Sequence, residues 1–166
     1  IGMEYMYIRH PERVNWIQKW INKNGNHPNF NKEQKTHILK KLNEAVTFEQ
    51  FLHTKYVGQK RFSLEGGESL IPAIDALIET AALDGVEQFV FGMAHRGRLN
   101  VLAHVMHKPL TKIFGEFEGY LDPSMAEGSG DVKYHLGASA DYQTSAGRTI
   151  AIELSCNPSH LEAADP

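Results

Sequence analysis

The sequence predicts an α/β fold in which N-terminal helices precede the opening of a parallel sheet. Helical patterns fill its first third, and from Gly66 onward helical stretches alternate with two short apolar runs at residues 88–91 and 149–154. Such alternation is typical of α/β layer folds. The run at 88–91 is apolar almost throughout, which also indicates a strand that is buried on both faces, as the strands of a parallel sheet are. A chain of 166 residues suffices for one domain, or for one domain with a small appendage.

The first third is predicted to hold two amphipathic helices. Apolar residues recur at three- and four-residue spacing over residues 12–23, with Trp16 and Trp20 as large aromatic anchors. After a loop rich in Asn, Gly and Pro, a second helix begins at Asn31, and Gln34 three residues later completes a variant of the capping box. The buried face of this helix is expected to comprise Ile38, Leu42, Ala45, Phe48 and Leu52.

Three further helices are predicted after a glycine-containing hinge at residues 58–67. The first covers residues 68–83 and ends before Gly85, which suits the left-handed position that follows a helix. The other two cover residues 98–106 and 110–117. The apolar face of the helix at 68–83 is expected to hold Leu70, Ile74, Leu77, Ile78 and Ala81.

Composition excludes several classes of protein. The 17 basic and 20 acidic residues give a net charge of -3 without any Lys/Arg block, so nothing favours a nucleic-acid or membrane-surface partner. Cys156 is the single cysteine, which excludes an internal disulfide and a cysteine-based zinc motif and indicates a reducing compartment. No apolar run approaches the roughly 20 residues of a membrane span. The N-terminus does not resemble a signal peptide, and both ends look cut from a longer chain.

Polar residues gather after the first predicted strand, at the position where open α/β sheets bind ligands. Gly92 and Gly97 allow sharp turns there, and His95 can gain or lose a proton near neutral pH. Arg96 and Arg98, beside a helix start, can donate to phosphate or carboxylate. Residues 92–100, the segment that holds these side chains, are also compatible with a helix cap and a surface ion pair.

A second polar cluster, GDVKYHLG at residues 130–137, combines an acid, a base, a phenol and an imidazole. Taken alone, it fits the edge of a sheet with a solvated charged face as well as it fits a site. Among the nine histidines, His104 and His107 are three apart on a predicted helix, but no carboxylate or third histidine joins them at a suitable interval. We therefore expect no metal site within this stretch of sequence.

Four segments occur in one order along the chain: YVGQKRFSLEGGE at 56–68, GMAHRGRLNVLA at 92–103, GSGDVKYHLG at 128–137 and NPSHLEAADP at 157–166. Together they make the chain resemble the thiamine-diphosphate-dependent dehydrogenase (first) component of the 2-oxoglutarate dehydrogenase complex. The resemblance covers essentially the whole chain, and four ordered motifs are highly specific. It implies an internal fragment, with a helical segment at residues 1–57 and the N-terminal part of the thiamine-diphosphate-binding α/β domain at residues 58–166.

This resemblance implies an enzyme of the tricarboxylic acid cycle. Such an enzyme decarboxylates 2-oxoglutarate on thiamine diphosphate, with Mg²⁺, and transfers the succinyl group to a lipoyl group of a partner succinyltransferase component. A homodimer in the bacterial cytoplasm or the mitochondrial matrix is implied as well. Two alternatives stay open: a 2-oxoadipate dehydrogenase of the same family, against which Tyr134 argues, and a non-catalytic anion-binding or assembly module.

The resemblance also implies roles for individual residues. His95 and His135 match active-site histidines that hold the substrate and handle protons. Arg96 matches a residue that contacts both the cofactor and the 2-oxo acid. Tyr134, beside His135, belongs to the substrate side of the implied site.

Two further residues, Ser159 and Leu161, match positions that line the cofactor. The family's magnesium–diphosphate motif and the glutamate that activates the aminopyrimidine would both lie beyond Pro166. The resemblance therefore implies that this chain holds one wall of an active site and is inactive by itself.

Overall fold

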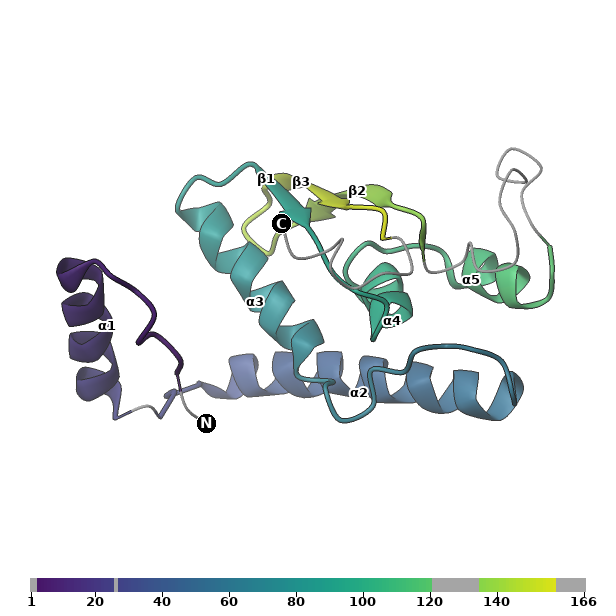
Figure 1. Ribbon diagram of the computed structural model, residues 1–166, viewed down its shortest axis with the longest axis horizontal. Coiled ribbons are helices and arrows are strands. Elements are labelled where there is room, and N and C mark those ends of the chain that lie inside the picture. The colour runs from purple at the N-terminus through teal and green to yellow at the C-terminus, as the bar shows by residue number, and fades with distance from the viewer. Residues whose placement is uncertain (1–2, 26, 121–134, 158–166) are drawn as a thin grey trace. The chain divides into compact units, whose positions relative to one another are not determined.

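The computed structural model describes residues 3–25, 27–120 and 135–157. The described residues form an α/β fold, which confirms the predicted class (Figure 1). Contacts divide the chain into two compact units, Ile1–His37 and Ile38–Pro166, and the functional boundary expected between residues 57 and 58 stays a prediction. The elements, in chain order, are α1 (Pro11–Asn24), α2 (Lys32–Lys55), α3 (Leu70–Leu83), β1 (Gln88–Phe91), α4 (Arg98–His104), α5 (Leu110–Phe117), β2 (Ala138–Gln143) and β3 (Thr149–Leu154).

The start of α2 is fixed by the capping box that its sequence predicts. The Asn31 backbone N–H donates to Gln34 Oε1 at 3.0 Å, and the Gln34 backbone N–H donates to Asn31 Oδ1 at 2.8 Å. These reciprocal bonds satisfy donors that the first turn of a helix would otherwise leave without partners. Farther along α2, the buried face comprises Ala45, Phe48, Glu49 and Leu52, so it includes one carboxylate that the apolar pattern did not predict.

The buried face of α3 differs from the predicted one. Leu77, expected in the core, is 54% exposed, and Leu70 is exposed as well. The cause is Asp75, whose carboxylate accepts a hydrogen bond from the Tyr142 hydroxyl at 2.6 Å and pairs with Lys41 Nζ at 2.8 Å. These bonds turn Asp75 inward, and the side chains that α3 buries are Ile71, Asp75, Ile78 and Ala82. The helix ends as predicted, with Gly85 at φ 92°.

The sheet of the described residues has the strand order β1-β3-β2. β1 and β3 are parallel, as predicted, with Phe91 opposite Leu154. β2 was not predicted as a strand; it pairs antiparallel with β3, so the sheet is mixed. Figure 1 shows α3 and α4 together on one side of this sheet. None of the described helices combines the length and apolarity that crossing a bilayer requires.

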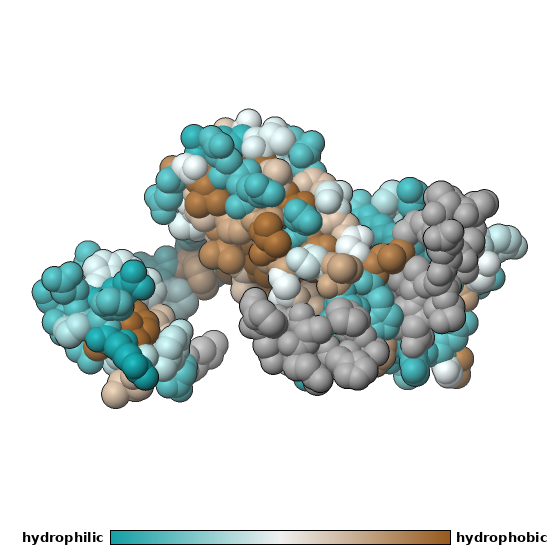
Figure 2. All heavy atoms as spheres, turned by 45° about the horizontal axis from the view of Figure 1, so that its top comes forward, coloured by the Kyte–Doolittle hydropathy of each residue, from teal (hydrophilic) through white to brown (hydrophobic). Residues whose placement is uncertain are grey.

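The prediction that the strand at residues 88–91 is buried on both faces is wrong for the residues described, and β3 is buried on one face only as well. Ile150, Ile152 and Leu154 of β3 are buried, whereas the residues between them are exposed. On β1, Val90 is 62% exposed. The described helices cover only one face of the sheet. Because successive side chains of a strand point to opposite faces, every second side chain points away from these helices and is exposed. Figure 2 shows apolar surface over the region of α3 and β1, where Leu77 and Val90 are exposed.

Candidate active site

The two segments expected to form a site leave the sheet at the same edge. Because β1 and β3 are parallel neighbours in register at Phe91 and Leu154, their carboxyl ends coincide. The Ser155 backbone N–H continues the ladder by donating to the Phe91 carbonyl oxygen at 2.9 Å. The segment that carries His95 and Arg96 therefore begins beside the segment that carries Asn157. Ligands of open α/β sheets bind at this edge.

A buried guanidinium ties the edge together. Arg98 is 0% exposed and donates to the carbonyl oxygens of Met93 at 3.3 Å, Leu136 at 2.9 Å and Ser155 at 2.5 Å. These three acceptors belong to the segment after β1, the segment before β2 and the segment after β3. Burial lowers the pKa of Arg98. The proposal that Arg98, like Arg96, offers its donors to an anion is therefore wrong, because its side chain is engaged by the backbone.

His135 is held against the end of β3. Its Nδ1 lies 2.5 Å from the Asn157 carbonyl oxygen, and the Asn157 backbone N–H donates to the His135 carbonyl oxygen at 2.9 Å. A carbonyl oxygen can only accept, so Nδ1 carries the proton and the neutral ring has its lone pair on Nε2. Gly137 makes this approach possible, because a Cβ atom there would lie 2.8 Å from the Leu154 carbonyl oxygen.

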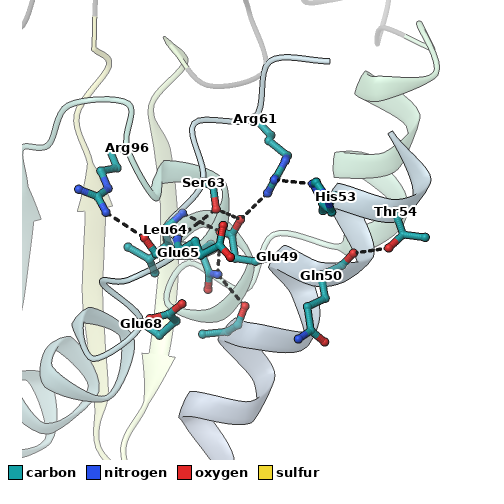
Figure 3. Close-up of polar contacts among 12 residues, drawn as sticks. Glu49, Gln50, His53, Thr54, Arg61, Ser63, Leu64, Glu65, Glu68 and Arg96 are labelled. Atoms are coloured by element: carbon teal, nitrogen blue, oxygen red, sulfur yellow. Dashed lines mark hydrogen bonds and ion pairs between the residues drawn. The ribbon is translucent and has the colours of Figure 1, made fainter. Parts of the chain in front are cut away.

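His95 and Arg96 contact the loop that precedes α3. The His95 ring is half-buried, and its centroid lies 4.1 Å from that of Phe62. Arg96 is exposed, and its Nη2 donates to the Glu65 carbonyl oxygen at 2.9 Å (Figure 3). Among the described residues, Arg96 donates a hydrogen bond to Glu65, and a guanidinium carries five N–H donors. Arg96 therefore retains donors for an anion.

Sequence reasoning missed Asn157 as a candidate. Asn157 is 2% exposed, and neither Nδ2 nor Oδ1 has a hydrogen-bond partner among the described residues. Buried amides are rarely left without partners, so this side chain is suited to meet a polar group. The turn signal Asn-Pro-Ser after the second apolar run was the available clue. Tyr134, Ser159 and Leu161, the remaining predicted site residues, lie outside the described residues.

The histidines of α4 and its following turn have packing roles. His104 is half-buried, with its ring 5.5 Å from Phe48 in an edge-to-face arrangement, and His107 stacks on Tyr142 at 5.9 Å. Burial is the main cause that lowers the pKa of His104. In the part of the chain that the structure describes, no three His, Cys, Asp or Glu side chains are grouped so as to hold a metal ion.

Comparison with known proteins identifies the family. Residues 40–160, more than half of the chain, match the model of the dehydrogenase E1 component. The chain is 56% identical over its whole length to a "Multifunctional 2-oxoglutarate metabolism enzyme" of Mycolicibacterium vanbaalenii, and 54% identical to one of Mycobacterium sp. (strain JLS). It is 50% identical to the "2-oxoglutarate dehydrogenase E1/E2 component" of Corynebacterium glutamicum. The chain spans only 13 to 14% of the length of these relatives. It belongs to the dehydrogenase E1 component family.

Proposed function

We propose that this chain forms one wall of the active site of a 2-oxoglutarate dehydrogenase, which decarboxylates 2-oxoglutarate and transfers the succinyl group to a lipoyl group. The observation that carries the proposal is Arg96, an exposed guanidinium at the carboxyl end of β1 in a member of the dehydrogenase E1 component family. The relatives' names contain 2-oxoglutarate, which favours this substrate over 2-oxoadipate. Fifty-six per cent identity over the whole chain also argues against a non-catalytic module.

The geometry supports distinct roles for the proposed site residues. Arg96 binds the carboxylate of the 2-oxo acid or the diphosphate of the cofactor, because its fork matches either anion. His135, with Nδ1 bonded to the Asn157 carbonyl oxygen, is fixed in the tautomer whose Nε2 can accept a proton. His95, half-buried against Phe62, holds the substrate and handles protons beside Arg96.

Thiamine diphosphate fits the chemistry of these residues. Arg96 supplies positive charge for a diphosphate, and the buried Asn157 amide offers a donor and an acceptor that the described residues leave without partners. Ser159 and Leu161 are proposed to line the same cofactor, and Tyr134 the substrate. When bound, thiamine diphosphate supplies the electron sink that decarboxylation of a 2-oxo acid needs. Its Mg²⁺ would be held by residues beyond this chain.

The proposal extends to assembly and location. A lipoyl-bearing succinyltransferase accepts the succinyl group, and the full-length enzyme acts as a homodimer. The name of the Corynebacterium relative joins two components of such a complex. Because the relatives are bacterial, the bacterial cytoplasm is the favoured compartment of the two that the resemblance implies.

The test replaces Arg96 by alanine in the full-length protein and measures thiamine diphosphate binding and turnover of 2-oxoglutarate and 2-oxoadipate. Loss of a hydrogen-bonded charge is worth up to about 3 kcal/mol, so kcat/KM for 2-oxoglutarate should fall roughly 100-fold. Arg148→Ala is the matched control and should retain activity, because this exposed residue lies beside the β2–β3 turn and its guanidinium donates to the Ala82 carbonyl oxygen at the end of α3. Unchanged cofactor affinity and turnover in Arg96→Ala would refute the assignment. Faster turnover of 2-oxoadipate than of 2-oxoglutarate by the unaltered enzyme would refute 2-oxoglutarate as the substrate.

A further inference from the structure

A buried carboxylate lies behind the loop that contacts His95 and Arg96. Glu49 of α2 is 6% exposed and, among the described residues, accepts four hydrogen bonds. Oε1 accepts from the Leu64 backbone N–H at 3.0 Å and from Asn100 Nδ2 at 3.1 Å. Oε2 accepts from Ser63 Oγ at 2.8 Å and from Arg61 Nη1 at 3.2 Å. Three of these four donors belong to one short loop, residues 61–64.

A continuous chain of hydrogen bonds leads from Glu49 to Arg96 (Figure 3). The Ser63 hydroxyl donates to Glu49 and accepts the backbone N–H of Glu65 at 3.0 Å. The Glu65 carbonyl oxygen then accepts from Arg96 Nη2 at 2.9 Å. The two bonds that Glu65 makes are exposed, so the support that this chain gives Arg96 is geometric: each bond limits where the next group can lie.

The same loop touches the other residues of the segment after β1. The Gly97 backbone N–H donates to the Phe62 carbonyl oxygen at 2.7 Å, and the Phe62 ring packs on His95. Gly97 has a φ of 74°, and a Cβ atom there would lie 2.5 Å from Leu64 Cδ1, so the two segments approach too closely to admit a side chain at residue 97. A displacement of the loop would therefore move His95 and Arg96 with it.

We propose that Glu49 is a positioning residue, which holds the loop at residues 61–65 so that Arg96 and His95 keep the geometry that ligand binding requires. Site residues need support from packing and hydrogen bonds behind them to stay within a fraction of an ångström of a productive position. Glu49 supplies that support from α2, a helix that carries none of the residues proposed to touch the ligand. It does not touch the ligand. The link to catalysis rests on the proposed function, whereas the link to the geometry of residues 95–97 does not.

The test uses the full-length protein and the variant Glu49→Gln, which keeps the shape of the side chain but removes its charge. Amide hydrogen exchange without substrate should become at least about tenfold faster in peptides that contain Leu64 and Gly97. The KM for 2-oxoglutarate should rise about tenfold, with a smaller change in kcat, and the same substitution in an Arg96→Ala background should cause little further loss. Glu44→Gln, on the same helix in a half-exposed pair with Lys40, is the matched control and should change neither readout.

The outcomes separate this inference from the proposed function. Unchanged exchange at Gly97 in Glu49→Gln refutes the positioning role, whatever the activity. Equal losses of affinity in the presence and absence of Arg96 refute the link to Arg96, since they show that the loss does not pass through that side chain. If Arg96→Ala itself leaves affinity unchanged, the proposed function fails, and exchange alone decides the role of Glu49. Should Glu49→Gln not fold, Ser63→Ala removes the hydroxyl that makes two bonds of the same chain, to Glu49 and from Glu65, and is judged by the same two measurements.

Discussion

Replacing Arg98 by methionine should loosen the edge of the sheet without altering the residues that are proposed to touch a ligand. The guanidinium donates to the carbonyl oxygens of Met93, Leu136 and Ser155. Methionine refills much of the volume of the side chain but offers no hydrogen-bond donor. The three carbonyl oxygens that now accept from Arg98 therefore each lose a hydrogen bond. Because these groups lie on three different segments, the segments also lose the group that joins them.

The size of the effect follows from the geometry. The bonds to Ser155 and Leu136, at 2.5 and 2.9 Å, are short, whereas the bond to Met93 at 3.3 Å is weak. Two bonds to a charged group contribute about 3 to 6 kcal/mol before the cost of desolvating the cation is subtracted. That cost is real here, since burial lowers the pKa of Arg98. A net loss of about 3 kcal/mol is expected, which corresponds to roughly a 100-fold increase in local opening.

Hydrogen exchange followed by mass spectrometry on the full-length protein measures this opening directly. Peptides that contain Met93, Leu136 or Ser155 should exchange roughly 100-fold faster in Arg98→Met than in the wild type. Arg148→Met removes an exposed arginine beside the β2–β3 turn and should leave the same peptides unchanged. Wild-type exchange in all three peptides of Arg98→Met would show that the guanidinium does not hold the segments together.

Two further substitutions test the packing around the site. Lys41→Met leaves the buried Asp75 carboxylate without its cation and should cost about 3 kcal/mol of unfolding free energy in denaturant titrations. Lys40→Met, which removes an exposed pair with Glu44, should cost only about 0.4 kcal/mol, so equal losses would contradict the reasoning. Burial lowers the pKa of His104 below 6.5 in the folded protein, so the unfolded chain binds more protons than the folded one. The stability that neutral His104 contributes is therefore complete above pH 6.5, and it is lost as the pH falls through the pKa of the folded state. Acidification should therefore destabilise the wild type more than His104→Leu in thermal unfolding scans, and equal pH dependence would argue against the burial of a neutral ring.

Elements with strong local signals were predictable from the sequence. The capping pair Asn31 and Gln34 forms both expected bonds, and β3 has the predicted bounds. β2 was missed because its inward residues, Ala138, Ala140 and Tyr142, include two alanines, which give little hydrophobic contrast. The hairpin turn before β3 offered a second clue, since Ser-Ala-Gly is a turn signal.

The site was predictable in position but not in construction. Placing His95 and Arg96 at a strand end follows from the order of apolar and polar segments along the chain. The partners of Arg98 do not, because Leu136 and Ser155 are 38 and 57 residues away. Nothing local in a sequence says which of two neighbouring arginines turns inward. Here the helix that begins at Arg98 sends it into the core, and Arg96 in the preceding turn stays exposed.

Three buried charges share a pattern that explains how this fold holds its candidate site. Glu49, Asp75 and Arg98 each lie on the buried face of a helix and bond to groups on at least one distant segment. Apolar burial is non-directional, so the core brings the helices and the sheet together without fixing where each loop stops. Hydrogen bonds to a buried charge are directional. Each of these three side chains forms such a bond with a loop or with a strand of the sheet. Loss of such a bond frees the particular loop or strand that it holds, and local opening of that segment requires less free energy than global unfolding. We therefore expect variants at Glu49 and Arg98 to lose ligand affinity and local protection out of proportion to any loss of global stability, a divergence that an ordinary core substitution such as Ile152→Val should not show.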